Sequence, residues 1–411
     1  MGRTKSVYLK LPQKRSQLNC GRYIRYPMLL HANAQIPVFV KTLMGLEDVL
    51  SEELRSLGAK DIYPGRRGVS CVCDEETLYK ILIHSRLALR VLVRLKGGHV
   101  TNEEELYQWV QTIDWHSFIT LKHTLAVDVV TFHPEMNHSV FLAQKTKDAI
   151  VDWFREQYEL RPSVHPKDPD VRINVHISKD GSAHIGLDAS GRSMNQRGYR
   201  VHSGKAAINE VLAAGLIAMS LWDPETPFVD PMCGSGTLAI EAAMIAKKRA
   251  PALLNENFGI KRWPQFRETL WSRLIRDAKR DERRDVDWIY ASDQDSRVIE
   301  QCKKNIKAAR LTHNICVSEK PFQKLWIPEG NGVIISNPPY GEHLGERERL
   351  KPMYEELGKV LRYKAKGYKA YFITPDPEFK KSVPMKHGKI FNVLNGTIPC
   401  EYISYSIGSK K

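Results

Sequence analysis

The sequence predicts an α/β protein in two parts: an N-terminal α+β region followed by a doubly wound domain built around a mostly parallel sheet. Before residue 190 the apolar pattern forms short strands and helices in mixed order, whereas after residue 206 strands and helices alternate. Regular alternation is typical of parallel strands joined by crossover helices. We expect the boundary at 190–206, where Gly191, Gly198 and Gly204 interrupt both patterns.

The elements of the N-terminal region follow from the spacing of its apolar residues. Leu46, Val49 and Leu50 begin a series with intervals of three and four, which is typical of one helix face. Asp180-Gly181 is a turn signal between two alternating segments, so these segments are expected to pair as strands. The expected helices are 44–58, 75–85 and 142–158, and the expected strands are 38–40, 69–73, 123–132, 170–177 and 183–188.

The second region begins with a helix at 207–221 and an apolar strand at 228–229. An insertion at 251–286, rich in Trp and Arg, separates the next helix from the next strand. An antiparallel hairpin over 389–408 is expected to close the sheet. The other expected helices are 237–249, 296–309 and 348–363, and the other expected strands are 287–292, 332–336 and 368–374.

The composition favours a nucleic-acid partner, because 62 Lys and Arg against 47 Asp and Glu give a formal net charge of +15. No apolar run reaches the ~18 residues that a membrane span needs, and no secretory leader is apparent. The seven cysteines are scattered without a C-x-x-C pair. We therefore expect reduced thiols, no metal site and a cytoplasmic location.

Residues 1–36 differ from the remainder of the chain, because they contain seven Lys and Arg and no Asp or Glu. Their apolar residues show no sustained period, so the sequence predicts a basic, flexible tail. Such a tail could contact RNA, direct the protein to an organelle or serve only as a solvated extension. The sequence leaves these alternatives open.

The first motif, Asp230-Pro-Met-Cys-Gly-Ser-Gly-Thr237, lies between a predicted strand and a predicted helix. Gly234 and Gly236 permit a tight turn and a close approach to a ligand, at the strand end where doubly wound sheets bind ligands. It is neither the G-K-[ST] phosphate loop nor the three-glycine dinucleotide fingerprint. Asp230 suits a positively charged amino-acid moiety, although a Gly-rich turn alone is equally compatible with a structural role.

The second motif is Ser292-Asp293-Gln294-Asp295, after the next predicted strand. A carboxylate at this position is placed to accept hydrogen bonds from both hydroxyls of a ribose, which assigns that role to Asp293. Asp295 is expected to cap the following helix. The spacing from the glycine loop exceeds the ~20 residues of a minimal unit, and the insertion at 251–286 explains the excess.

The third motif, Ile335-Ser336-Asn337-Pro338-Pro339-Tyr340, also follows a predicted strand, and its two prolines stiffen the turn. An aromatic amine is a poor nucleophile because its lone pair is delocalised into the ring. Hydrogen bonds from the amine to the Asn337 carboxamide oxygen and the Pro338 carbonyl would localise that lone pair. Tyr340 could stack on the base, a contact worth ~1–3 kcal/mol. The alternative is an ordinary Pro-rich turn.

The three motifs resemble those of class I (Rossmann-like) methyltransferases of the N-P-P-Y type. Residues 37–411 resemble ribosomal-RNA guanine-N2 methyltransferases that carry a THUMP domain, with the bacterial large-subunit (23S) enzymes as the nearest match. The resemblance also rests on Arg197-Gly198-Tyr199-Arg200, Leu212-Ala213-Ala214, Leu238–Ala246 and Pro169–Val175. It implies a ferredoxin-like subdomain at 37–76, a THUMP RNA-binding domain at 77–189 and a single S-adenosylmethionine-dependent methyltransferase domain at 190–411.

The resemblance also implies a role for each site residue. S-adenosyl-L-methionine would be held by Asp230, Cys233, Gly234, Gly236 and Thr237 at its methionine end, by Asp293 at its ribose and by Glu319 near its adenine. Asn337, Pro338 and Tyr340 would form the catalytic pocket, and Arg197, Tyr199 and Arg200 would contact RNA. The family often has an Asp near the adenine, whereas Ser318–Phe322 has none, so Glu319 is the expected substitute.

The implied reaction is direct methyl transfer to N2 of a guanine in 23S rRNA, without a metal. The base must leave its stack, so single-stranded or looped RNA is expected. The N-P-P-Y motif alone leaves open a tRNA guanine-N2, a DNA adenine or a protein glutamine methyltransferase, and a non-catalytic RNA-binding ribosome assembly factor is a further alternative. The N-terminal resemblance favours RNA, and the presence of Asp230, Asp293 and Asn337 favours an enzyme.

Overall fold

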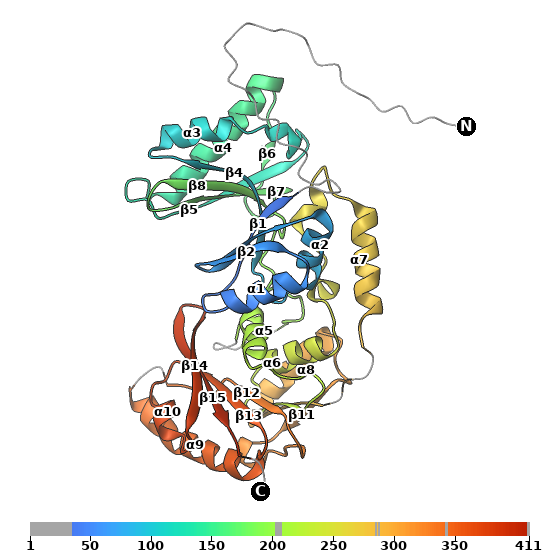
Figure 1. The fold of residues 1–411 in the computed structure, drawn as a ribbon, viewed down its shortest axis with the longest axis vertical. Helices are drawn as coiled ribbons and strands as arrows, with labels where there is room; N and C mark the ends of the chain where they lie inside the picture. Colours follow the sequence, from blue (N-terminus) through green and yellow to red (C-terminus); the bar gives the residue numbers. More distant parts are fainter. Residues whose placement is uncertain (1–34, 202–207, 284–285, 287, 342–343, 409–411) are drawn as a thin grey trace, which may run out of the picture.

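The computed structural model describes residues 35–201, 208–283, 286, 288–341 and 344–408 of the 411-residue chain. These residues form two sheets, one in each part of the chain (Figure 1). The predicted basic tail lies outside the described residues except for its last two positions, and so does Cys20.

The N-terminal sheet has eight strands in the order β2-β3-β1-β4-β8-β7-β5-β6. Its strands are β1 (Ile36–Lys41), β2 (Lys60–Gly65), β3 (Gly68–Cys73), β4 (Arg90–His99), β5 (Thr124–Thr131), β6 (Ser163–Val164), β7 (Val171–Ile177) and β8 (Ser182–Asp188). Its helices are α1 (Glu47–Ser56), α2 (Glu75–His84), α3 (Glu103–Gln111) and α4 (Ser139–Tyr158). Alternate residues of β7, from Val171 to Ile177, are buried, as expected for a sheet with one face on a core.

The predicted strands and helices of this region are present, and the structure adds β2, β4, β6 and α3. Two of the additions have weak local signals: β2 is a polar edge strand that contains Pro64, and β4 includes Gly97 and Gly98. The expected division after residue 76 falls inside α2, and β1 to β4 are continuous with β5 to β8 in one sheet.

The second sheet has seven strands in the order β11-β10-β9-β12-β13-β15-β14. The first five are parallel, and β15 is antiparallel to both of its neighbours. Its strands are β9 (Phe228–Asp230), β10 (Ile289–Asp293), β11 (Ile315–Glu319), β12 (Val333–Ser336), β13 (Lys369–Thr374), β14 (His387–Asn395) and β15 (Ile398–Ser406). Its helices are α5 (Glu210–Met219), α6 (Thr237–Ala246), α7 (Glu268–Arg280), α8 (Ser296–Ala308), α9 (Leu344–Lys364) and α10 (Phe379–Ser382).

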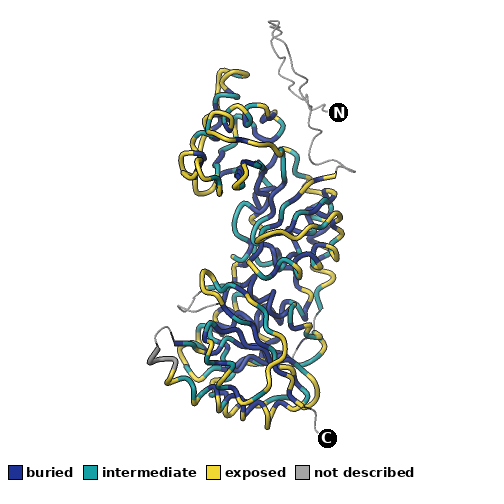
Figure 2. Tube along the Cα trace, turned by 60° about the vertical axis from the view of Figure 1, so that its left-hand side comes forward, coloured by how far each residue is buried: buried dark blue, intermediate teal, exposed yellow. Residues whose placement is uncertain are grey.

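Helices cover both faces of this sheet. One apolar core lies between the sheet and α5, α6 and α8, and a second core lies between the sheet and α9 and α10. Figure 2 shows the buried residues along the interior and the exposed residues on the outer loops. The predicted doubly wound architecture is therefore confirmed, with the predicted start positions 207 and 287 outside the described residues.

The insertion predicted at 251–286 joins the two parts of the chain. It contains α7, which the sequence pattern did not predict and which lies beside α2 (Figure 1). Phe258 and Trp271 of the insertion belong to the core of the N-terminal part. The backbone N–H of Arg267 donates a hydrogen bond of 3.0 Å to the hydroxyl of Tyr79 on α2. The aromatic composition of the insertion thus serves packing.

Strand β9 lies between β10 and β12 in the sheet. The chain adds β10 and β11 on one side of β9 and then β12 and β13 on the other side. A crevice is expected at the carboxyl ends of the strands where the direction of strand addition reverses. The three sequence motifs lie at the carboxyl ends of β9, β10 and β12, so this topology brings them to one edge.

Candidate active site

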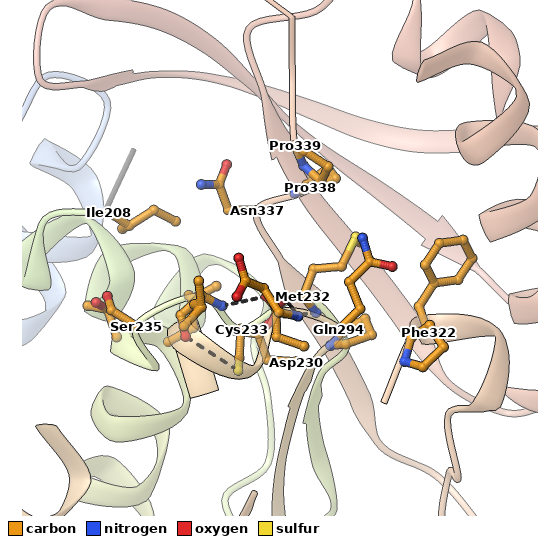
Figure 3. Close-up of a pocket in the computed structure, with 18 of the residues that line it drawn as sticks. Ile208, Asp230, Met232, Cys233, Ser235, Gln294, Phe322, Asn337, Pro338 and Pro339 are labelled. Carbon is orange, nitrogen blue, oxygen red and sulfur yellow. Dashed lines mark hydrogen bonds between the residues drawn. The ribbon is translucent and has the colours of Figure 1, made fainter. Parts of the chain in front are cut away.

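A cavity of about 610 Å³ lies at the carboxyl ends of β9, β10 and β12. Cofactor and small-molecule sites are usually ~300–1,000 Å³. Figure 3 shows Asn337 and Pro338 on one side of it and Asp230 and Cys233 on the other. Its walls include Ile208, Asp230, Met232, Cys233, Gly234, Ser235, Thr237, Asp293, Gln294, Phe322, Asn337, Pro338 and Tyr340.

The two glycines of the first motif serve different purposes. Gly234 and Gly236 have φ of +53° and +86°, a region that side chains disfavour. A Cβ on Gly236 would lie 2.5 Å from the Cys302 sulfur, so this glycine lets the loop pack against α8. A Cβ on Gly234 would meet no atom of the described residues within 4 Å, and Gly234 lines the cavity. Gly234 therefore leaves backbone accessible to a ligand.

Asp293 connects the first two motifs. Its Oδ2 accepts a hydrogen bond of 3.1 Å from the Gly234 N–H, and its Oδ1 accepts one of 3.1 Å from the Asp295 N–H. A carboxylate has about four acceptor positions, so Asp293 can also accept hydrogen bonds from a ligand in the cavity. Asp295 accepts a hydrogen bond of 2.9 Å from the Arg297 N–H and caps α8, as predicted.

Asp230 is a buried acid at the edge of the cavity, with 1% of its surface exposed. Its Oδ1 accepts hydrogen bonds from the Ser336 hydroxyl at 2.6 Å and from the Met232 N–H at 3.3 Å. Burial raises the pKa of Asp230 to about 7, despite these two hydrogen bonds, and the nearby charge of Asp293 adds to the effect. A cation bound beside Asp230 would offset the cost of burying its charge.

Cys233 and Thr237 complete the loop that leads into α6. A hydrogen bond with Cys302, together with burial, holds the pKa of Cys233 well above its usual range. The thiol is therefore neutral and unsuited to nucleophilic attack. Thr237 is the first residue of α6 and lines the cavity. The N-terminus of this helix favours an anion such as a carboxylate.

A hydrogen bond from helix α9 holds the third motif in place. Asn337 directly follows β12 and lines the cavity with Pro338 and Tyr340. The carbonyl of Pro339 accepts a hydrogen bond of 3.0 Å from the hydroxyl of Tyr354, a fully buried residue of α9. Sequence reasoning missed Tyr354, whose only signal is an aromatic residue within a polar helix. It also missed Ser336, which links this motif to Asp230.

Glu319, the residue expected to contact adenine, is not among the residues that line the cavity. Glu319 ends β11 and is exposed, outside the cavity lining, because the strand ends with its side chain toward solvent. Phe322, three residues later, is buried and lines the cavity. An aromatic ring there can pack against a flat heterocycle. The sequence contained one signal for this role, because Phe322 is the only aromatic residue of the Ser318–Phe322 stretch.

Arg197 and Tyr199 occupy buried positions that do not support the expectation of RNA contacts. The Arg197 side chain is 1% exposed, lies 3.6 Å from the Glu241 carboxylate and donates a hydrogen bond to the Met194 carbonyl at 2.6 Å. The Tyr199 hydroxyl donates to the same carboxylate at 3.0 Å. Both side chains therefore bind α6, because a buried carboxylate requires such partners.

Arg200 is half-buried beside the Asp230–Thr237 loop. Its guanidinium pairs with Glu210 at 2.7 Å and donates to the Ile208 carbonyl at 2.7 Å and the Thr237 hydroxyl at 3.2 Å. These bonds connect the start of α5 to the start of α6. Asn305 of α8 supports the same loop, because its amide donates to the Ser235 carbonyl at 3.0 Å.

The residues around the cavity fit S-adenosylmethionine in size and in chemistry. Asp230 and the N-terminus of α6 can bind the ammonium and carboxylate of a methionine moiety. Asp293 can bind ribose hydroxyls, and Phe322 can pack on adenine. In the described part of the chain no group of three or more His, Cys, Asp or Glu side chains could hold a metal ion. No helix in the same residues has the length and apolarity to cross a membrane.

Three family models match consecutive parts of the chain. Residues 37–92 match the RlmL ferredoxin-like domain, residues 100–188 match the THUMP domain and residues 197–404 match the RMKL-like methyltransferase domain.

Individual proteins match over most of the chain. A Synechocystis protein named as a candidate RNA methyltransferase is 35% identical over 372 residues, covering 90% of this chain and 97% of that protein. The ribosomal RNA large subunit methyltransferase K/L of Syntrophotalea carbinolica is 35% identical over 393 residues, covering 92% of this chain but only 55% of that protein. The solved structure of SMU.472, a candidate methyltransferase complexed with S-adenosylhomocysteine, is similar with a TM-score of 0.84 at 29% identity, covering 92% of this chain and 99% of that one.

Proposed function

Because the chain belongs to the family of RNA methyltransferases that combine a ferredoxin-like domain, a THUMP domain and an RMKL-like methyltransferase domain, we propose that it methylates N2 of a guanine in large-subunit ribosomal RNA. The protein is an S-adenosylmethionine-dependent RNA methyltransferase. The observation that carries the proposal is the joint position of Asp230, Asp293 and Asn337 on one cavity.

The cofactor, when bound, supplies an electrophilic methyl carbon attached to a positively charged sulfur. In the proposal Asp293 binds its ribose, and Asp230 in its ionised form binds its ammonium group. Gly234 and Thr237 bring backbone and the N-terminus of α6 to its carboxylate. Phe322 takes the adenine contact that was expected of Glu319. These residues fix the methyl carbon at one position in the cavity.

The Asn337 carboxamide oxygen and the Pro338 carbonyl accept hydrogen bonds from the amino group of the target base. These bonds draw the nitrogen lone pair out of the ring and aim it at the methyl carbon. Tyr340 stacks on the base, and Tyr354 holds the motif through the Pro339 carbonyl. Correct placement of two reactants can lower a barrier by ~7–11 kcal/mol, so positioning is the main contribution of these residues.

The choice of the large subunit is supported by the relative named as a large-subunit rRNA methyltransferase, and the choice of guanine N2 rests on the motif resemblance alone. The chain spans about half the length of that relative. We therefore assign the relative's substrate to this chain only as a proposal. The THUMP match supports an RNA-binding role for the N-terminal part, which would hold the RNA while the target base leaves its stack.

Methyl transfer by the purified full-length protein tests the proposal. The protein is incubated with methyl-tritiated cofactor and, in parallel, with large-subunit rRNA, small-subunit rRNA, tRNA or DNA from a strain that lacks it. We expect label in large-subunit rRNA, in N2-methylguanosine after digestion to nucleosides. Label in tRNA would reassign the substrate, and label only in methyladenine would contradict guanine.

A further inference from the structure

The first four strands are part of the eight-stranded sheet, with helices on one face and no helix of the described residues on the other. The element order β1-α1-β2-β3-α2-β4 and the strand order β2-β3-β1-β4 define this unit. Val38, Val91 and Val93 point to the covered face, where they pack in one core with Leu50 of α1 and Leu78 of α2. Figure 1 shows α1 and α2 below and to the right of β1 and β2.

The opposite face carries aromatic side chains on neighbouring strands. In the strand register Tyr63 of β2 and Phe39 of β1 both lie opposite Ser70 of β3, which places the two rings in one row. Tyr63 is 67% exposed. The Phe39 ring lies across β3, because a Cβ on Gly68 would be 2.4 Å from its tip. A four-stranded sheet with aromatic residues on its open face is the platform on which RRM domains stack RNA bases.

Cationic side chains lie beside Phe39 on the same face. The Arg94 guanidinium lies 5.3 Å from the centre of the Phe39 ring. Burial lowers the pKa of Arg94, and no carboxylate of the described residues offsets this effect. Burial also lowers the pKa of Lys41, although the carboxylates of Asp188 and Asp128 act in the opposite direction. Lys41 donates a hydrogen bond of 3.4 Å to the Asn174 amide oxygen. Arg90 pairs with Asp188. Positive charge is therefore in excess here, and a phosphate group would balance it.

The same face continues across the remaining strands without a break in the sheet. His184 of β8 and His176 of β7 lie opposite each other on it. Burial lowers the pKa of both imidazoles, and Arg94 lowers both further. Phe132, just after β5, is 61% exposed, and its ring lies 5.7 Å from that of His176. At ~4.8 Å per strand, the six steps from β2 to β5 span about 29 Å across the sheet, which is room for several nucleotides.

One end of this face adjoins the catalytic domain. Gly45, shortly after β1, packs against the backbone of Asn392 on β14. Leu46 packs against Gly215 of α5. Lys41 at the end of β1 therefore lies at the edge from which a bound RNA strand could continue toward the cavity.

We propose that this open sheet face, formed by Phe39, Lys41, Tyr63, Arg94, His176 and Phe132, binds a single-stranded segment of the RNA that carries the target base. The inference rests on the proposed function, because it takes RNA as the substrate. Stacking on aromatic rings tolerates any sequence, and base faces are accessible only in an unpaired strand. The open sheet face thus selects single-stranded RNA over duplex.

Binding of a fluorescent single-stranded oligoribonucleotide to full-length variants tests the inference. Tyr63→Ala and Phe132→Ala should each weaken binding about fivefold or more, the low end of the effect of a lost base stack. Arg94→Gln should also lower the slope of log affinity against log salt by about 0.7, the value for one phosphate contact to a single strand. The matched controls Tyr363→Ala, 77% exposed on α9, and Arg297→Gln, 86% exposed on α8, should bind like the wild type.

Thermal melting confirms that each variant is folded, and Tyr63 tolerates truncation because its side chain is exposed. Wild-type affinity in the Tyr63, Phe132 and Arg94 variants would overturn the inference, and so would equal weakening in the controls or equally strong binding of the annealed duplex. Methyl transfer to rRNA separates the two proposals. If the wild type methylates rRNA while the three variants bind normally, only the open sheet face is wrong. If RNA binding depends on Tyr63 while no RNA is methylated, only the proposed reaction is wrong.

Discussion

Replacing Asp230 with Asn should stabilise the cofactor-free protein while weakening cofactor binding. Burial raises the pKa of Asp230 to about 7, roughly three pH units above the ordinary value of 3.8. Such a difference corresponds to about 4 kcal/mol. An asparagine can accept the same hydrogen bonds from Ser336 and Met232 without carrying a charge. The stability cost of the charge should therefore disappear in Asp230→Asn.

The sign and the pH range follow from proton linkage. Asp230 loses its proton near pH 4 in the unfolded chain and near pH 7 in the folded protein. Between these values the folded protein holds a proton that the unfolded chain has released, so stability falls as the pH rises. At pH 8 the variant should exceed the wild type by up to about 4 kcal/mol. At pH 6 protonation of the wild type should reduce that gain by about 1.4 kcal/mol.

Thermal unfolding at the two pH values measures this gain, at about 2–4 °C per kcal/mol for a domain of 150–250 residues. The transition of the catalytic domain is identified as the one that S-adenosylhomocysteine shifts in the wild type. The matched control is Glu300→Gln, an acid on α8 that is 62% exposed and should change stability little at either pH. In calorimetry Asp230→Asn should bind S-adenosylhomocysteine ~1.5–3 kcal/mol more weakly, the scale of a lost charged hydrogen bond. A variant less stable than the wild type at both pH values, or a gain independent of pH, would refute the reasoning.

Three further changes test separate parts of the site. Asn337→Ala should lower the methylation rate far more than cofactor affinity, because its contact is to the reacting amine; equal losses measured by kinetics and calorimetry would contradict this. Gly236→Ala should destabilise the protein more than Gly234→Ala, because both incur ~1–2 kcal/mol for positive φ but only the former clashes with Cys302. Melting curves of the two variants check that order. Arg200→Met should weaken cofactor binding without changing RNA affinity, and the reverse result would restore Arg200 as an RNA contact.

Much of the architecture is predictable from the sequence because the relevant signals are local. Alternating strands and helices after residue 206 specify a parallel sheet, and the turn residues after β9, β10 and β12 specify its ligand edge. The elements that were missed depend on distant partners. The apolar face of helix α7 packs on the core of the N-terminal part. That core is formed by residues far earlier in the chain. Strand β2 has a polar sequence and is a strand because β3 supplies its hydrogen bonds.

In the site, too, the features with local sequence signals were predictable and those that depend on distant residues were not. Asp230, Asp293 and Asn337 line the cavity as expected because each lies at the carboxyl end of a strand of the parallel sheet. The burial of Arg197 and Tyr199 could not be foreseen, because their partner Glu241 lies some forty residues later on α6. A basic and aromatic cluster in sequence is typical of an RNA contact, and only the fold shows that these side chains face inward.

Nucleoside analysis of rRNA from living cells tests whether the protein methylates N2 of a guanine in large-subunit rRNA. Mass spectrometry compares large-subunit rRNA from a strain that lacks the protein with rRNA from the same strain carrying the wild type or Asn337→Ala. We expect one N2-methylguanosine to be missing in the deletion strain, to return with the wild type and to stay missing with Asn337→Ala. An unchanged N2-methylguanosine content with a different methylated nucleoside missing would contradict the substrate, and full restoration by Asn337→Ala would contradict the mechanism.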